Sequence, residues 1–327
     1  MQPQQPQQPI NPSEYGLEEQ EPKSWWKGAL KFLFVMLVIA LLLLYFFIPF
    51  NTVDFGVKSG HTNFSLISAG ETNTQFYPNM RFPTTTISYK IDNCTLKKIE
   101  DMQGAFEIIS KSTDLEFYSV STNEEISVTC DSRNKIEGGL FIAGEGGAKN
   151  ITRAGDFSVI SEGIVLLIKE SKCERPNIAI HELLHVLGFE HSLNPNNIMY
   201  NISRCNQIIG DDTIELIKEL YSLPSYPDLV LENVSATMNG RFLDTNISVR
   251  NNGLAAAPNT SISIYAEDKL VKEIQLSPLG VGHGSLVSST NFVIKDRKVQ
   301  ELKFVINSDF DELDKKNNEL VMVVGES

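Results

Sequence analysis

The stretch that decides the fold of this chain is His181-Glu182-Leu183-Leu184-His185-Val186-Leu187-Gly188-Phe189-Glu190-His191. On a helix, His181 and His185 lie one turn apart on the same face, so both imidazoles can bind one ion. Gly188 stands where the helix must end, because glycine takes the left-handed conformation that turns the chain back towards the same ion. His191 then supplies a third nitrogen. Three nitrogen ligands leave the fourth tetrahedral position open, which is typical of a catalytic zinc site.

The zinc-site interpretation is specific, because five fixed residues at these spacings arise by chance in about one chain in a hundred thousand. The plain alternative is an amphipathic helix with solvated histidines. The chain has five histidines, and three of them lie in this stretch. The other two, His61 and His283, are isolated, so we expect them to be exposed polar residues.

Size and charge limit the class of protein. At 327 residues the chain is long enough for two domains beyond a targeting segment. Its net charge of −13 argues against nucleic acid as a partner, since such proteins carry clustered Lys and Arg.

The N-terminal region predicts a membrane anchor. Residues 1–28 are rich in Gln and Pro and then acidic, so we expect a disordered cytoplasmic tail. Residues 32–48 form an uninterrupted apolar run, and the predicted span, residues 29–50, has the length that crosses the hydrocarbon core. A cleaved signal peptide is the alternative, but the apolar run is long and no small-residue cleavage site follows it. The basic residues Lys23, Lys27 and Lys31 precede the uninterrupted apolar run, which predicts a single-pass protein with everything after the span outside the cell.

The next two regions differ in composition. Residues 51–79 are polar and predict a stalk. Residues 80–223 alternate between strand and helix patterns and predict an α+β domain with a mixed sheet and three helices. Strands are expected at 87–91, 115–120, 126–130 and 157–169, a first helix at 95–112, and a Gly-rich loop at 138–147.

This domain resembles the matrixins, the matrix-metalloprotease-like metzincins. The resemblance rests on the extended histidine motif, on Ser192 after it, on Ile198-Met199-Tyr200, and on the helix that begins at Asp211-Asp212. It implies a zinc-dependent endopeptidase that hydrolyses peptide bonds in proteins, with one catalytic zinc held by the three histidines. It also implies that an extended substrate pairs with an edge strand within residues 140–154.

The resemblance and the residue chemistry assign roles near the metal. Glu182 is the expected general base, because it lies between two ligands and can take the proton of the attacking water and pass it to the leaving amine. Met199 is expected in the family's Met-turn beneath the metal, and Tyr200 is expected to shape the substrate pocket.

The chain departs from the matrixins in three ways. Asn201 stands where the family has a proline, so we expect the wall of the primed-side substrate pocket to differ. No cysteine switch precedes the domain. Residues 100–175 lack the histidines of the family's structural zinc site, so we expect one zinc, and nothing predicts bound calcium.

Four cysteines follow the span and predict two disulfides in an exported domain. A Cys173 to Cys205 bridge would clamp the active-site segment, and a Cys94 to Cys130 bridge would tie the first helix to a strand. The other two pairings and free thiols remain open.

Residues 224–327 change to short alternating strands. Seven are expected, which indicates an immunoglobulin-like all-β sandwich. Pro227-Asp228-Leu229 and the segment Asp311 to Glu319 resemble the CARDB family, cell-adhesion-related modules of bacterial and archaeal surface proteins. The resemblance implies that the sandwich positions substrate or binds a cell-surface ligand. The alternative function for the whole chain is therefore an adhesion protein with an inactive metzincin fold, and the presence of Glu182 favours the enzyme.

Overall fold

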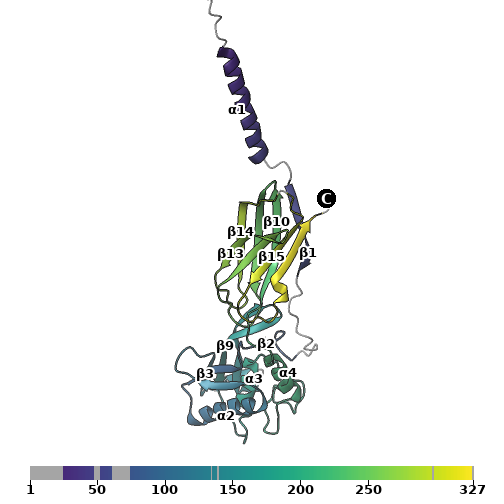
Figure 1. Ribbon diagram of the computed structural model, residues 1–327. Coiled ribbons are helices and arrows are strands. Elements are labelled where there is room, and N and C mark those ends of the chain that lie inside the picture. Colours follow the sequence, from purple (N-terminus) through teal and green to yellow (C-terminus); the bar gives the residue numbers. More distant parts are fainter. Residues whose placement is uncertain are drawn as a thin grey trace, which may run out of the picture. The chain divides into compact units, whose positions relative to one another are not determined.

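The structure is a computed structural model that describes residues 25–47, 52–60, 74–133, 135–137, 140–296 and 298–325. The chain forms two compact units, Met1–Asn51 and Thr52–Ser327. Among the described residues, the first unit contributes helix α1, and the second contains every strand and three further α-helices (Figure 1).

Helix α1 (Trp25–Phe47) is apolar apart from Lys27 and Lys31 near its start. Its segment Trp25–Leu44 has a mean hydropathy of 2.4, and none of it is buried. By length and composition it can cross a membrane, which takes about 20 apolar residues; a signal sequence has the same features. The expected span began at residue 29, but the helix begins at Trp25, so the end of the expected tail is helical. Residues 1–24 of that tail lie outside the described residues.

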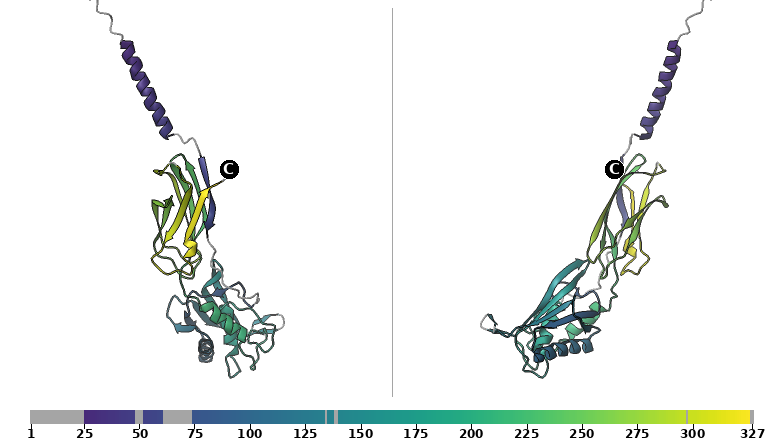
Figure 2. Two further views of the ribbon diagram at one scale, coloured as in Figure 1. Left: turned by 45° about the vertical axis from the view of Figure 1, so that its right-hand side comes forward. Right: turned by 90° about the vertical axis from the view of Figure 1, so that its left-hand side faces the viewer.

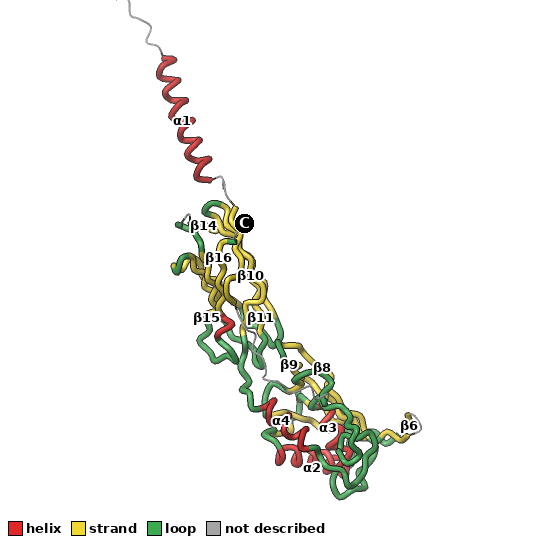
Figure 3. The backbone as a smooth tube through the Cα atoms, turned by 90° about the vertical axis from the view of Figure 1, so that its right-hand side faces the viewer, coloured by secondary structure: helices red, strands yellow, loops and turns green. Residues whose placement is uncertain are grey.

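The central domain is built on a six-stranded mixed sheet. Its main path runs β2 (Met80–Arg81), β9 (Phe157–Leu167), β5 (Ile126–Cys130), β3 (Thr86–Asp92) and β4 (Glu116–Ser119). The neighbours along this path are parallel. Strand β8 (Gly144–Ala154) is antiparallel to β9 and pairs with no other described strand, so it forms an edge (Figure 3). A two-stranded hairpin, β6 (Lys135–Glu137) and β7 (Leu140–Ile142), precedes it.

Three helices complete this domain: α2 (Leu96–Ser112), α3 (Asn177–Val186) and α4 (Asp211–Tyr221). Helix α2 buries Met102, Phe106 and Ile109, which lie on one face at helical spacing. Helix α3 packs against α2, β8 and β9, and its apolar side chains join the same core. The predicted α+β class with a mixed sheet and three helices is confirmed.

The second domain is an all-β sandwich whose strands follow a continuous order. That order is β13 (Lys269–Leu276), β12 (Thr260–Ala266), β15 (Glu301–Asn307), β16 (Glu319–Val324), β1 (Thr52–Gly60), β10 (Leu229–Asn239), β11 (Phe242–Asn251) and β14 (Gly284–Val293), with a 3₁₀ turn at Lys316–Asn318. All seven predicted strands are present.

The eighth strand, β1, comes from the segment expected to be a stalk. Its first residues pair with β10 and its later residues pair with β16, so it joins the two layers of the sandwich (Figure 2). Phe55 lies in the sandwich core with 8% of its surface exposed. The stalk interpretation is therefore wrong for residues 52–60, and the central domain is an insertion between β1 and β10. Residues 61–73 of the expected stalk lie outside the described residues.

A buried arginine holds together the two ends of the inserted domain. Arg81 is fully buried, and its guanidinium donates to the carbonyls of Phe82, Pro83, Leu220 and Leu223. It also lies 4.5 Å from the ring centroid of Tyr221, whose hydroxyl accepts a hydrogen bond from the Phe82 backbone N–H. Burial lowers the pKa of Arg81. The contacts join the start of the domain to the end of α4, as an insertion requires.

The two domains of the second unit meet through an apolar cluster. Ala154, Phe157 and Val159, around the turn between β8 and β9, pack with Leu254 of the sandwich. Gly155 in that turn has φ +54°, and a Cβ on it would lie 3.0 Å from the Cβ of Asn252. The hairpin that carries the edge strand β8 therefore rests on the sandwich at its far end.

Candidate metal centre

Helix α3 carries the first half of the histidine motif and ends where the sequence predicts. The backbone N–H of Leu187 bonds to the carbonyls of Leu183 and His185, and Gly188 follows with φ +97°. A Cβ on Gly188 would also lie 2.6 Å from the Cβ of Met80. Glycine is required here both for its backbone conformation and for the space, and the turn brings His191 back to the helix.

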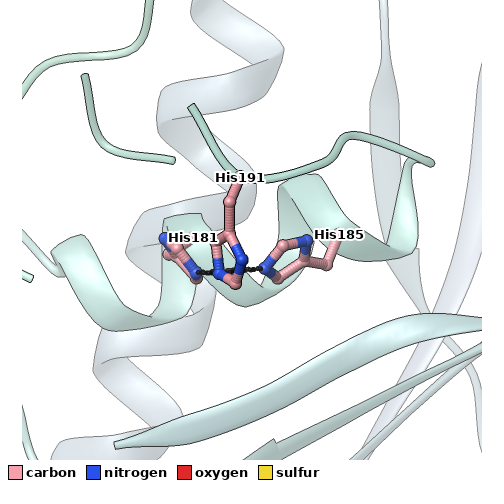
Figure 4. Close-up of side chains that lie close together, drawn as sticks. All are labelled: His181, His185 and His191. Carbon is pink, nitrogen blue, oxygen red and sulfur yellow. Dashed lines mark hydrogen bonds between the residues drawn. The ribbon is translucent and has the colours of Figure 1, made fainter. Parts of the chain in front are cut away.

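The three histidines converge through the same ring nitrogen (Figure 4). Their Nε2 atoms lie 3.0 Å apart for His181 and His185, 3.2 Å for His181 and His191, and 3.3 Å for His185 and His191. A tetrahedral zinc ion about 2.0–2.1 Å from each nitrogen needs ligand nitrogens about 3.3 Å apart. The donor set therefore fits zinc. Within the part of the chain that the structure describes, His181, His185 and His191 are the cluster of potential ligand side chains close enough together to hold a metal ion.

The other ring nitrogens are fixed by the backbone. The Nδ1 of His181 lies 2.7 Å from the carbonyl oxygen of Ile198, and the Nδ1 of His185 lies 2.7 Å from that of Phe189. Each Nδ1–H can donate to its carbonyl, which leaves Nε2 as the electron-pair donor. Burial lowers the pKa of His181 and, together with the neighbouring His181, lowers that of His185 to about 4. Both rings are thus neutral at neutral pH, which is the form that binds metal.

The side chain of Glu182, a residue of α3, faces the edge strand β8. It is 6% exposed, and burial, with a smaller contribution from the charge of Glu145, raises its pKa to about 8. A Cβ on Gly144 would lie 2.8 Å from the Oε1 of Glu182, and one on Gly146 would lie 2.2 Å from its backbone oxygen. These two glycines allow β8 to lie directly against the Glu182 side of the helix.

Comparison with protein families gives two matches. Residues 81–222 match the matrixin family, and residues 226–322 match the CARDB family. The chain carries a matrixin domain and a CARDB domain. Both resemblances in the sequence are thereby confirmed, and the matrixin domain supports a metallopeptidase at the level of the family.

The solved structures similar to this chain include CARDB domains. A crystal structure of one from Pyrococcus furiosus, in complex with di-metal ions, is 18% identical, covers 30% of this chain and 88% of its own, and has a TM-score of 0.26. A solution structure of a CARDB domain from the same organism is also 18% identical, covers 30% of this chain and 94% of its own, and has a TM-score of 0.27. No curated protein matches the chain.

The segment after the histidines of the matrixin domain folds back onto the site. Met199 is buried, and its carbonyl accepts a hydrogen bond of 2.8 Å from the Ser192 N–H. Because the preceding carbonyl, that of Ile198, contacts His181, Met199 is held next to the histidines. Met199 and His191 also line a cavity of about 370 Å³ together with Thr74, Leu193 and Asp212. Tyr200 is half-buried and does not line this cavity.

Both predicted disulfides of the matrixin domain are present, with Cys94 bonded to Cys130 and Cys173 bonded to Cys205. The second bridge joins the chain just before α3 to the loop after Met199. The first joins the chain before α2 to the end of β5. The histidine helix and the loop that contacts it are therefore covalently linked.

Sequence reasoning missed one segment of the site. Residues of the expected stalk pair with the turn after α3: the Phe76 N–H donates to the Gly188 carbonyl at 3.0 Å, and the Glu190 N–H donates to the Thr74 carbonyl at 2.8 Å. The Phe76 ring centroid lies 5.8 Å from that of His185. The adjacent aromatic residues Phe76 and Tyr77, in an otherwise polar stretch, were the available signal.

Proposed function

We propose that this chain is a membrane-anchored zinc endopeptidase that hydrolyses peptide bonds of proteins outside the cell. The observation that carries the proposal is the convergence of three Nε2 atoms at 3.0 to 3.3 Å, with Glu182 on the same helix. The matrixin domain supports the same class of activity.

The residues of the site divide the chemistry among them. His181, His185 and His191 would hold the zinc ion, which supplies a Lewis acid that activates water and polarises the scissile carbonyl. The Glu182 carboxylate takes a proton from the attacking water and later donates it to the leaving nitrogen. Burial raises the pKa of this carboxyl group, whereas the charge of a bound cation would lower it, and the two opposing effects keep both forms accessible near neutral pH.

The edge strand supplies the place for the substrate. Strand β8 pairs with β9 on one side, and an extended peptide can add to its other side through main-chain hydrogen bonds. Gly144 and Gly146 bring this strand against Glu182. A peptide bound along β8 thus places its backbone beside the general base and the three histidines.

Helix α1 would anchor the protein. It has the length and composition of a membrane span, and Lys23, Lys27 and Lys31 lie near its N-terminal end, which favours a cytoplasmic N-terminus. The matrixin and CARDB domains would then lie outside the cell. We assign to the CARDB sandwich the positioning of substrate or the binding of a surface component, since the hairpin of β8 and β9 rests on it.

The test is the change Glu182→Gln in the full chain, assayed with an unstructured protein as substrate. Without the carboxylate, proton transfer fails, and we expect cleavage to fall by about 10² to 10⁴-fold. The matched control is Glu215→Gln, an exposed residue of α4 in the same domain, which should cleave at the wild-type rate. A zinc chelator should stop wild-type cleavage, and added zinc should restore it. Unchanged cleavage by Glu182→Gln would refute the role of this residue.

A further inference from the structure

The edge strand β8 presents its side chains alternately to its two faces near the site. Gly144 and Gly146 face helix α3, because a Cβ on either would meet Glu182. Side chains alternate along a strand, so Glu145 and Gly147 face the opposite side. Glu145 is exposed, and a Cβ on Gly147 would meet no atom within 4 Å.

The neighbouring strand β9 continues this outer face. Glu145 pairs with Leu166, and Gly147 pairs with Ile164. Two residues of β9 face helix α3 and the core. A Cβ on Gly163 would lie 2.4 Å from Val186 of α3, and Val165 is 1% exposed. Ile164 lies between them and is 49% exposed. The outer face therefore holds a carboxylate, an open space and an exposed aliphatic side chain next to one another.

A peptide strand added to β8 has its own alternation. The residue opposite Gly147 points to the same outer face, as cross-strand neighbours do. Because Gly147 has no side chain, nothing on this residue separates the substrate side chain from Ile164, its partner on β9. A long aliphatic stem can therefore lie over Gly147 towards Ile164 while its charged end reaches Glu145, which is how Lys and Arg cover apolar surface and keep their charge in water.

We infer that Glu145, Gly147 and Ile164 form a subsite that selects a Lys or Arg side chain of the substrate. The inference rests on the proposed peptidase activity and adds to it the class of substrate. Glu145 adjoins Gly144, whose position contacts the Glu182 carboxylate, so the selected residue lies close to the cleaved bond. Because neighbouring residues of an extended peptide face opposite sides, the preference belongs to one position and not to the positions directly beside it.

The test uses the full-length protein and a set of quenched fluorescent peptides that carry Lys, Glu or norleucine at each position within five residues of the cleaved bond. At one position the wild type should cleave the Lys peptide at least about tenfold faster than the Glu peptide, because like charges at close range are strongly disfavoured. The preference should shrink at high salt, since the site is exposed to solvent. Norleucine should fall between the two.

Two variants assign the preference to this residue. Glu145→Lys should lose or reverse it, and Glu145→Gln should bring Lys and norleucine peptides to similar rates. The control is Glu116→Lys, the same charge change at an exposed position of β4, the strand at the other end of the main sheet path; it should keep the wild-type preference.

The outcomes separate the two proposals. Cleavage that depends on Glu182 but shows no preference for Lys, or a preference that Glu145→Lys leaves unchanged, would overturn the subsite while leaving the peptidase activity in place. Absence of any Glu182-dependent cleavage would overturn the proposed function, and the subsite with it.

Discussion

Two of the three converging histidines, His181 and His185, are each fixed by two contacts, and the sequence shows only one of the two. The spacing of His181, His185 and His191 predicts that their rings meet. It does not predict the carbonyls of Ile198 and Phe189 that fix the Nδ1 atoms, because those contacts depend on how the later loop folds back. The residue types were therefore predictable, whereas their tautomers and orientation required the structure.

Arg81 gives a residue-scale prediction. Replacement by Met keeps a long apolar stem but leaves the two buried carbonyls of Phe82 and Leu220 without this donor. An unsatisfied buried polar group costs about 1–3 kcal/mol, so we expect Arg81→Met to lower the free energy of unfolding of the matrixin domain by about 3 kcal/mol or more. Urea unfolding followed by circular dichroism measures this change.

The matched control for Arg81 is Arg133→Met. Its side chain is 88% exposed and pairs with Asp131, and exposed pairs contribute about 0–1 kcal/mol. Equal unfolding midpoints for Arg81→Met and the wild type would show that the Arg81 hydrogen bonds do not stabilise the contact between the two ends of the inserted domain.

At the scale of elements, the contact between β8 and α3 positions Glu182, the proposed general base. Gly146→Ala puts a methyl group where a backbone oxygen of Glu182 lies 2.2 Å away, so the strand or the helix must shift. Displacement of catalytic groups by about 1 Å costs about 10²-fold in rate. We expect Gly146→Ala to lower kcat/KM by about that factor while the protein stays folded.

Gly104→Ala is the control for this change. Its Cβ would lie 3.4 Å from Pro176, an ordinary contact, and alanine is favoured in helix α2. The variant should keep full activity. If Gly146→Ala also kept full activity, the close approach of β8 to α3 would not be needed for the reaction.

The same contact explains what the sequence could not reveal about the elements. Periodic apolar patterns predicted α2, β3, β5 and the sandwich strands to within a few residues. Residues 138–147 were expected to be a loop because glycine is rare in strands, yet β8 begins at Gly144. The glycines are there because the helix leaves no room for side chains, and that tertiary requirement outweighs local strand propensity.

At the scale of the molecule, the main difference from the sequence prediction is the eighth strand of the sandwich. Strand β1 contains only Val53 and Phe55 as inward apolar residues, too few to distinguish it from a polar linker. Its partners, β10 and β16, begin at Leu229 and Glu319. Local sequence patterns cannot report a pairing over so long a separation.

Phe55 tests this arrangement in the full chain. It is buried in the sandwich core, whereas Val57 on the same strand is 58% exposed. Replacing a buried Phe by Ala costs about 3–5 kcal/mol, so Phe55→Ala should lower the unfolding midpoint of the sandwich clearly, and Val57→Ala should change it little. Equal midpoints for the two variants would show that β1 is not part of the folded sandwich.

The central claim is that the three histidines hold one zinc ion beside Glu182 as the general base. Its most direct test is zinc content and protein cleavage measured on the same preparations of the wild type and Glu182→Gln. The account predicts about one zinc per chain in both proteins and cleavage by the wild type alone. Cleavage by Glu182→Gln at the wild-type rate, or an active wild type without zinc, would contradict it.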